Sequence, residues 1–218
     1  MNAYMSKIFL EILDYNRQQV LRTLSNFRDE GYLAGGTALA LQLGHRTSYD
    51  FDIFMDHPVT KKLKDKIKKK FGKVIYKWNT DEQITLNIIE NNIGITFVEQ
   101  DFKPAFPLIE TPHLALASVE DIAADKAYTI GRRAVWRDYV DIFVILKKKI
   151  ATLQNIINFA AKKCEGMFVE IQFLEQLVYF EDIEQTPIEF IGENYSYEQI
   201  TSGLKQEVEE YLQSRNKA

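Results

Sequence analysis

The sequence contains 218 residues, of which 46% are hydrophobic and 27% are charged, and its formal net charge is -4. This composition is ordinary for a soluble globular protein with a sizeable core, and the charge excludes a uniformly basic nucleic-acid coat. Cys164 is the single cysteine, which excludes a disulfide within the chain and a cysteine metal site.

No apolar run reaches membrane-spanning length, and Glu11 and Asp14 interrupt the apolar residues where a signal peptide would be continuous. We therefore expect a cytoplasmic protein with no membrane contact. The charge is unevenly divided, since residues 1–150 carry 22 basic and 19 acidic side chains whereas residues 151–218 carry 5 and 12. Any contact with a polyanion is thus expected in the first part of the chain.

The chain begins with apolar residues at helical spacing over positions 4–30, interrupted near Asp14 to Asn16. We expect a broken helix there that packs behind the first strand and has no chemical role. A short apolar run at 32–34 then predicts a strand, followed by a tight turn at Gly35-Gly36, where a bulky anion could approach the backbone closely.

Thr37 is expected to open a short helix that stops at Gly44. The start of a helix directs unpaired N–H groups and a partial positive charge at whatever lies over the preceding residues. The glycine pair followed by a helix therefore predicts a phosphate-binding turn. A Gly-Gly pair before a helix, taken alone, is more often only a turn.

Two acidic residues, Asp50 and Asp52, alternate with Phe51 and Ile53 at strand spacing. Side chains alternate along a strand, so both carboxylates should face one way while the apolar residues face the core. Two neighbouring carboxylates need a cation, and hard oxygen ligands beside a phosphate site indicate Mg²⁺. A solvated strand end is the alternative for an isolated Asp-x-Asp pair.

This order of an apolar residue, Gly-Gly, a short helix and Asp-apolar-Asp-apolar resembles the signature of polymerase-β-type nucleotidyltransferases. The fuller pattern is similar to the AbiEii/AbiGii-type nucleotidyltransferase toxins of bacterial toxin–antitoxin systems. It consists of GGTALAL, Gly44-His45-Arg46, Ser48 and DFDIF. The resemblance implies an α/β (α+β) nucleotidyltransferase domain with a small mixed sheet, followed by a mostly helical C-terminal domain.

A lysine-rich helix is predicted next, with Thr60 as its N-cap and Gly72 as its stop. Its narrow apolar face is Leu63, Ile67 and Phe71, and most of its other positions are lysine. We favour a solvated helix face, and the alternative is a phosphate-backbone contact for an RNA acceptor near the rim of the carboxylate site.

Three further strands are predicted at Lys73–Trp78, Gln83–Ile89 and Ile93–Glu99, the last two joined by a turn. The proline-containing segment Phe102–Pro112 is the expected linker. Nucleotidyltransferases of this broad class often carry a third carboxylate on a later strand. The open face of the last strand should show Gly94, Thr96 and Val98, and neither Glu99 nor Asp101 would reach it without a bulge. The general base is therefore left unassigned.

The second half of the chain is predicted to be helical, at 119–130, 134–148, 151–164, 168–180 and 196–213. Lys126 could be a surface residue with a buried stem or a cation that reaches into a cleft. Asp138 and Asp141 share one helix face, and pairing with a nearby arginine is their alternative role. The same toxin family carries similar residues here, at Lys126, Arg133, Arg137, Asp138 and Asp141. That likeness implies that Lys126 contacts nucleotide phosphates and that Asp138 lines the active site.

Together these patterns predict a nucleotidyltransferase domain at 1–112 and a helical domain at 113–218. The expected reaction transfers a nucleotide from an NTP to an acceptor, either RNA such as tRNA or a protein, and releases pyrophosphate. Its context would be a bacterial toxin–antitoxin or phage-defence system with a protein antitoxin. The expected catalytic residues are Asp50, Asp52, Lys126 and Asp138, with the two strand carboxylates holding Mg²⁺. The expected nucleotide-binding residues are Gly35, Gly36, Thr37, His45, Arg46, Ser48 and Lys126.

Two other functions remain open from the sequence. One is a catalytically silent protein that binds a nucleotide or an antitoxin, and the other is an antibiotic-modifying nucleotidyltransferase. The intact pair of Asp50 and Asp52 argues against the silent protein, because a scaffold has no need of paired acids.

Overall fold

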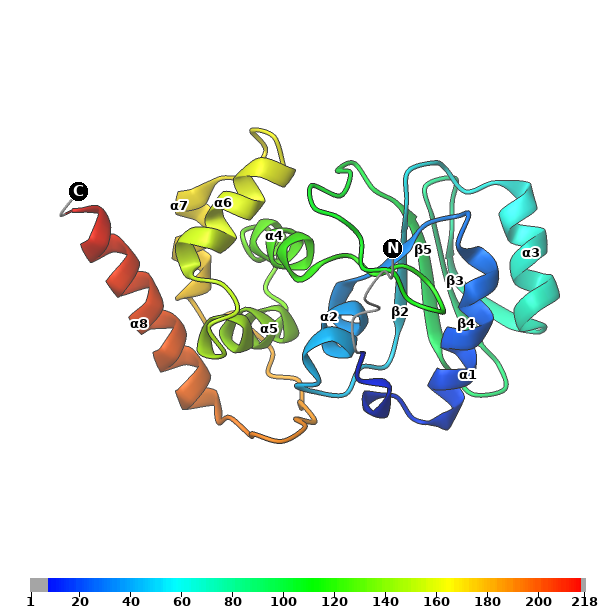
Figure 1. Cartoon of the computed structure of the whole chain (residues 1–218), viewed down its shortest axis with the longest axis horizontal. Helices are drawn as coiled ribbons and strands as arrows, with labels where there is room; N and C mark the ends of the chain where they lie inside the picture. Colours follow the sequence, from blue (N-terminus) through cyan, green and yellow to red (C-terminus); the bar gives the residue numbers. More distant parts are fainter. Residues whose placement is uncertain (1–7, 217–218) are drawn as a thin grey trace, which may run out of the picture. The chain divides into compact units, whose positions relative to one another are not determined.

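The chain divides into two compact units, Met1–Ser118 and Val119–Ala218, in a computed structural model that describes residues 8–216 (Figure 1). The predicted boundary between positions 112 and 113 stays a prediction. None of the helices among residues 8–216 combines the length and the apolar character that a membrane crossing requires.

The first unit contains a mixed five-stranded sheet in the order β1-β2-β5-β4-β3. The strands are β1 (Tyr32–Ala34), β2 (Phe51–Met55), β3 (Val74–Asn79), β4 (Gln83–Ile88) and β5 (Gly94–Glu99). Only the β2–β5 pair is parallel, and the other neighbours are antiparallel. The predicted small mixed sheet followed by helices is confirmed.

One face of the sheet is packed against helices. Phe51 and Ile53 of β2 are fully buried, as are their neighbours on β5. Phe27, at the end of the 3-10 helix η2 (Ser25–Phe27), lies with its ring centroid 5.3 Å from that of Phe97 and 5.6 Å from that of Phe71. Because Phe71 belongs to α3 (Lys61–Phe71), these rings join α3 to the buried face of the sheet.

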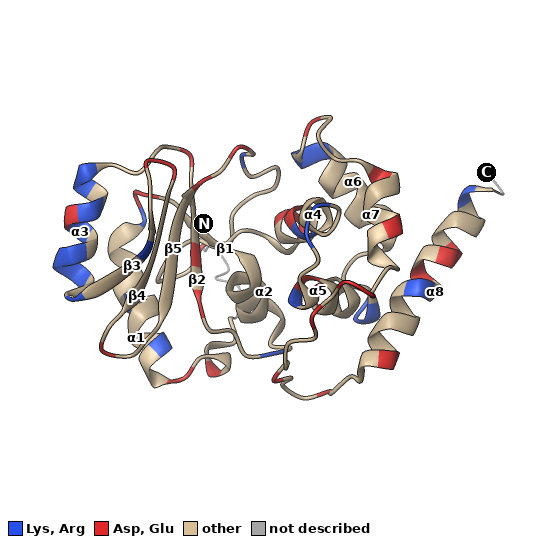
Figure 2. Cartoon of the chain, turned by 180° about the vertical axis from the view of Figure 1, so that it is seen from behind, with Lys and Arg blue, Asp and Glu red and all other residues tan. Residues whose placement is uncertain are grey.

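This packing corrects one expectation about the lysine-rich helix. Asp52 alternates with Ile53 on β2, so its carboxylate lies on the face opposite to the one that α3 covers. Figure 1 shows α1 (Tyr15–Leu24) and α3 on one side of the sheet and α2 (Gly35–Leu43) on the other. The basic surface of α3, blue in Figure 2, therefore does not lie at the rim of the carboxylate site.

The start of the chain follows the predicted break. The 3-10 helix η1 (Leu10–Ile12) comes first, and α1 begins after Asp14, whose side chain accepts a hydrogen bond of 2.9 Å from the Arg17 N–H. The predicted helical positions 4–7 lie outside the described residues. Thr60 caps α3 as predicted, accepting from the Leu63 N–H at 3.1 Å.

The helix α2 begins at the glycine pair, two residues before the predicted start at Thr37. Gly35 has φ +65° and makes the sharp turn out of β1, a conformation that side chains with a Cβ seldom adopt. Gly44, with φ +60°, ends the helix as predicted. The glycine pair therefore belongs to the first turn of α2, and the N–H groups of Gly35 and Gly36 are among those at the helix start.

The segment 102–112 has no helix or strand, as predicted. It is nevertheless held to the first unit, because the Arg28 side chain donates to the Thr111 carbonyl at 2.7 Å and to the His113 carbonyl at 2.6 Å. Leu116 also forms bridges with Leu33 and Ile109.

The second unit is helical, as predicted. Its helices are α4 (Val119–Ile130), α5 (Trp136–Lys147), α6 (Leu153–Lys163), α7 (Glu170–Leu177) and α8 (Tyr197–Arg215). On α5, the run from Tyr139 to Leu146, which is apolar except for Asp141, is buried around its whole circumference.

Candidate functional site

The two strand carboxylates lie on the open face of the sheet. Asp52 is on β2 and Asp50 immediately precedes it, and both alternate with the buried Phe51 and Ile53. Asp50 is exposed and Asp52 is half-buried. The expected arrangement of both carboxylates on one side of β2 is therefore present.

Each carboxylate lies directly against the backbone of a glycine. A Cβ built on Gly35 would stand 2.7 Å from Asp52 Oδ2, and one built on Gly94 would stand 2.4 Å from Asp50 Oδ1. Any side chain at either position would displace the acid. Sequence reasoning gave Gly94 no role, although a glycine inside a strand commonly marks the close approach of another group.

The start of α2 lies beside this pair. Its N-cap residue, Ala34, offers no side-chain cap, and the first N–H groups of a helix have no partner within the helix. These donors and the helix dipole favour an anion at the glycine turn. The carboxylate of Asp52, close to Gly35, can share that place with an anion only if a cation neutralises it.

Thr37 and Ser48 are joined to each other and to the strand. The Thr37 hydroxyl lies 2.7 Å from the Ser48 hydroxyl and also donates to the Asp50 carbonyl oxygen. Both side chains are buried. In this structure the two hydroxyls fix the loop that enters β2 against α2, and the predicted contact of either one with phosphate stays a prediction.

The His45 and Arg46 side chains, on the loop between α2 and β2, are buried. Arg46 is 3% exposed and His45 is 2% exposed. A Cβ on Gly36 would stand 2.6 Å from Arg46 Nη2, and Arg46 Nη1 donates to the Thr47 carbonyl at 2.9 Å. The guanidinium therefore adds positive charge beside the glycine turn, where phosphate is expected.

The donor set of this site fits Mg²⁺. Within residues 8–216 there is no group of three or more His, Cys, Asp or Glu side chains placed to hold a metal ion. Mg²⁺ is commonly held by one or two carboxylates together with substrate phosphates and water. One oxygen of Asp52 and one of Asp50 occupy the places that a Cβ would take at Gly35 and Gly94, so glycine at both positions is what lets these two possible ligands lie there.

In the second unit, the structure brings the predicted Lys126 and Asp138 together. Lys126 Nζ lies 2.6 Å from Asp138 Oδ1 and 2.7 Å from Asp141 Oδ2. Lys126 is only 6% exposed, so it is not a surface residue with a solvated head. Asp138 Oδ2 is buried with no hydrogen-bond partner among the described residues, which leaves it able to accept another donor.

A second buried lysine was missed from the sequence. Lys163 Nζ lies 3.3 Å from Asp121 Oδ1 and 2.8 Å from Asp125 Oδ1. Burial raises the pKa of Asp125, while the charge of Lys163 opposes that rise. The i, i+4 spacing of Asp121 and Asp125 on α4 was the available signal, but the partner on α6 is distant in the sequence.

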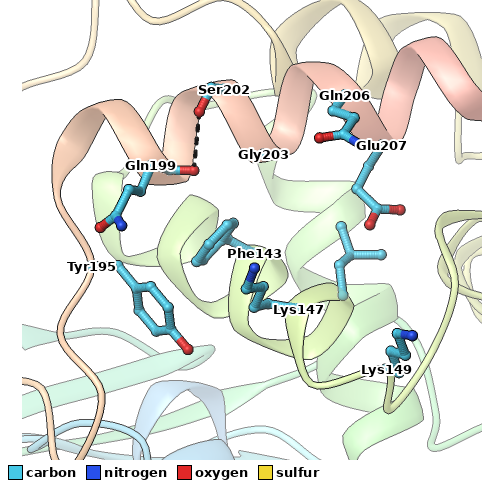
Figure 3. Close-up of a pocket in the computed structure, with 10 residues that line it drawn as sticks. Phe143, Lys147, Lys149, Tyr195, Gln199, Ser202, Gly203, Gln206 and Glu207 are labelled. Carbon is cyan, nitrogen blue, oxygen red and sulfur yellow. Dashed lines mark hydrogen bonds between the residues drawn. The ribbon is translucent and has the colours of Figure 1, made fainter.

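A hollow of about 470 Å³ lies between α5 and α8 (Figure 3). Phe143 and Lys147 line it from α5, and Gln199 and Glu207 line it from α8. None of the predicted site residues contributes to its lining. The hollow is therefore distinct from both the carboxylate pair and the Lys126 group.

A family model and a relative both match most of this chain. A family model described as "Nucleotidyl transferase AbiEii toxin, Type IV TA system" matches residues 19–77 and 57–217. An uncharacterised protein of Aquifex aeolicus (strain VF5) is 31% identical over 191 residues, which are 84% of this chain and 88% of that protein.

Two solved structures share the fold. One is a putative nucleotidyltransferase from H. pylori, with a TM-score of 0.58, 17% identity, and coverage of 93% of this chain and 96% of that one. The other is MenT4, a nucleotidyltransferase toxin from Mycobacterium tuberculosis, with a TM-score of 0.54, 12% identity, and coverage of 88% and 80%.

The two buried lysines generate a stability prediction. Lys126→Met and Lys163→Met should each lower the free energy of unfolding by about 3–5 kcal/mol, because each leaves at least one buried carboxylate, Asp141 or Asp121, without its cation. The exposed Lys147 provides a control, and Lys147→Met should change stability by less than about 0.5 kcal/mol. Urea unfolding curves measure all three. A loss below about 1 kcal/mol for either buried lysine would show that its ion pairs are not formed in solution.

Proposed function

Because the chain belongs to the family of AbiEii nucleotidyltransferase toxins of type IV toxin–antitoxin systems, we propose that it transfers a nucleotide from an NTP to an RNA acceptor with the help of Mg²⁺. That it is a nucleotidyltransferase follows from the family. The metal, the acceptor, the antitoxin partner and action in the cytoplasm are parts of the proposal.

One observation carries the proposal. Asp50 and Asp52 lie against Gly94 and Gly35, beside the start of α2. The N-cap residue of α2, Ala34, has no side chain that accepts a hydrogen bond from the first N–H groups of the helix. Two carboxylates and a set of N–H donors at one place suit a metal-bound phosphate. A catalytically silent binding protein would gain nothing from two acids on one face beside a helix start.

The residues of the site have separate roles. Asp50 and Asp52 would hold Mg²⁺, which when bound supplies positive charge that stabilises the α-phosphate during displacement. The first N–H groups of α2 bind triphosphate oxygens, and the glycines allow the close approach. Arg46 contributes a cation beside Gly36.

The reaction is an in-line displacement. The acceptor hydroxyl oxygen forms a bond to the α-phosphorus while the bond to the pyrophosphate oxygen breaks. The hydroxyl proton is lost to a base, and the open face of β5 offers only Gly94, Thr96 and Val98. We therefore assign the base to no residue of that strand.

For Lys126 and Asp138, the resemblance to the toxin family supports a part in nucleotide binding, with Lys126 contacting phosphate. Their mutual contact at 2.6 Å orients the lysine side chain. Asp141 gives Lys126 a second partner, so the cation can gain a phosphate contact without losing both carboxylates.

RNA is the favoured acceptor because the first unit carries a strongly basic helix. Lys66 of α3 is occupied by Asp29 at 3.0 Å and Glu30 at 2.8 Å. The exposed lysines of the helix are Lys61, Lys62, Lys68, Lys69 and Lys70. Since α3 lies behind the sheet, these lysines would hold the body of a folded RNA and not its reacting end.

The metal ligands can be tested by neutral substitutions. Asp50→Asn and Asp52→Asn should each abolish nucleotide transfer, because the metal loses a ligand. The thermal midpoint should stay the same or rise slightly, since two like charges no longer repel each other. Asp56→Asn, an exposed acid just after β2, is the matched control and should keep full activity. Near-wild-type turnover in either strand variant, measured with labelled nucleotide, would remove the carboxylate pair from the site.

Lys126 and Lys163 separate a role in binding from a role in stability. At a temperature where both Met variants are folded by circular dichroism, Lys126→Met should reduce turnover at least ~30-fold, as expected for loss of a charge-assisted contact of about 2 kcal/mol. Lys163→Met should keep turnover near the wild-type value. Equal effects of the two substitutions on turnover would mean that Lys126 is a structural residue only.

Charge reversal on α3 tests the acceptor. Lys62, Lys68 and Lys69 changed together to Glu should weaken RNA labelling and reduce the salt slope of binding by up to about one unit per lost phosphate contact. NTP binding should be unchanged. The exposed Lys147, Lys148 and Lys149 of the second unit, changed in the same way, provide a control of equal charge. Labelling that survives the α3 reversal with the same salt slope would make α3 a solvated face and favour a protein acceptor.

A further inference from the structure

Four side chains form one row across the open face of the sheet, and we call them the tryptophan row. Asp52 of β2 lies opposite Thr96 of β5. Thr96 lies opposite Thr85 of β4, which in turn lies opposite Trp78 of β3. Residues directly opposite each other project to the same face, so Trp78 shares the face of the carboxylates. It is three strand spacings, or about 14 Å, from Asp52.

A bulge places Trp78 on this face. The pairing of β3 with β4 shifts between Tyr76 and Trp78. With unbroken pairing, Lys77 would stand opposite Thr85 and Trp78 would turn to the packed face. Bulges are a common means of aiming a side chain at a functional site. Here the bulge turns a large ring away from the core and leaves it 57% exposed.

The floor between Trp78 and Asp52 is small and polar. The hydroxyls of Thr85 and Thr96 are 3.3 Å apart, and Gln83 Nε2 donates to Thr85 Oγ1 at 2.8 Å. All three side chains are half-buried. A floor of hydroxyl and amide groups, with an aromatic ring at its outer end, suits a ligand that is both planar and polar.

We propose that the tryptophan row binds a single-stranded nucleic-acid segment, with one base stacked on Trp78 and the strand running over Thr85 and Thr96 toward Asp52. This inference rests on the proposed function, because it supplies the path of the acceptor end. Bases in a duplex are already stacked, so only an unpaired end can use the ring. Lys73 and Lys77, both exposed on β3 or at its start, provide cations for its phosphates.

A nucleic acid fits this surface better than a protein strand does. β3 is the edge strand, and a peptide that extended the sheet would use its backbone groups and not the in-register path to Asp52. Because the row from Trp78 ends at Asp52, its ligand must be able to place a reacting group on the open face of the sheet. The unpaired end of an RNA chain has this property.

Binding measured without NTP tests the row independently of turnover. The probe is a labelled single-stranded oligoribonucleotide of about eight residues. Trp78→Ala should weaken its binding about tenfold, whereas Trp78→Phe, which keeps a ring, should weaken it much less. Tyr15→Ala removes another exposed aromatic residue of the same unit, and its affinity should match the wild type. Thermal midpoints should remain equal because both rings are exposed.

Intrinsic fluorescence gives a second readout. The chain has two tryptophans, and Trp136 is only 5% exposed, so the oligonucleotide should quench the emission of Trp78 and this response should disappear in Trp78→Phe. Equal affinity of wild type and Trp78→Ala for the oligonucleotide would overturn the inference. So would loss of a protein acceptor or antitoxin in Trp78→Ala while oligonucleotide binding is unchanged.

The row and the proposed function can fail separately. If Trp78-dependent binding is found but no RNA is labelled in the transfer assay, the row stands and RNA transfer is refuted. If RNA is labelled by the wild type and Trp78→Ala changes neither labelling nor affinity, the transfer reaction stands and the row is refuted.

Discussion

The first unit depends on holding two like charges close together. Because side chains alternate along β2, Asp50 and Asp52 lie on the same face of the sheet. Gly94 and Gly35 have no Cβ, so the Asp50 and Asp52 carboxylates can contact their backbone. The buried bonds from Thr37 to Ser48 and to the Asp50 carbonyl fix the entry of the strand, so the acids cannot move apart easily. Repulsion between these acids is tolerable where a cation is bound, and the proposed Mg²⁺ would supply that cation beside the N–H donors of α2 and Arg46.

The second unit holds its charges in the opposite way, with each cation placed between two acids. Lys126 and Lys163 are both nearly inaccessible, and both take two aspartates as partners. A buried ion pair is weak evidence for stability, because well-packed apolar residues would often serve as well. The two groups differ in that Asp138 keeps a buried oxygen with no hydrogen-bond partner among the described residues. This difference makes the Lys126 group the better candidate for exchange with a ligand, and it makes the Lys163 group its natural control.

The parts of this molecule that sequence could predict are local. The strand–glycine–helix order, the Asp-x-Asp alternation, the break near Asp14 and the cap at Thr60 depend on neighbours within a few residues, and they were predicted. Features that require distant partners were missed, such as the contact between Asp50 and Gly94 and the pairing of Lys163 with α4. The position of α3 behind the sheet depends on the contacts of Phe27, which periodicity on α3 alone does not reveal. The bulge before Trp78 is equally invisible, because one extra residue leaves no mark on composition.

The two faces of the sheet together limit what an acceptor can be. The carboxylates and Trp78 lie on the open face, whereas the lysines of α3 lie on the packed side, and β3 is the edge between them. A small molecule could reach the carboxylates without using either Trp78 or α3, so neither feature would serve an antibiotic substrate. A folded RNA with an unpaired end can use both, since its end can cross the open face while its body passes round the β3 edge to the basic helix. If only the lysines or only the ring proved to matter, the acceptor would approach from one face alone, and a smaller or less structured substrate would satisfy the site.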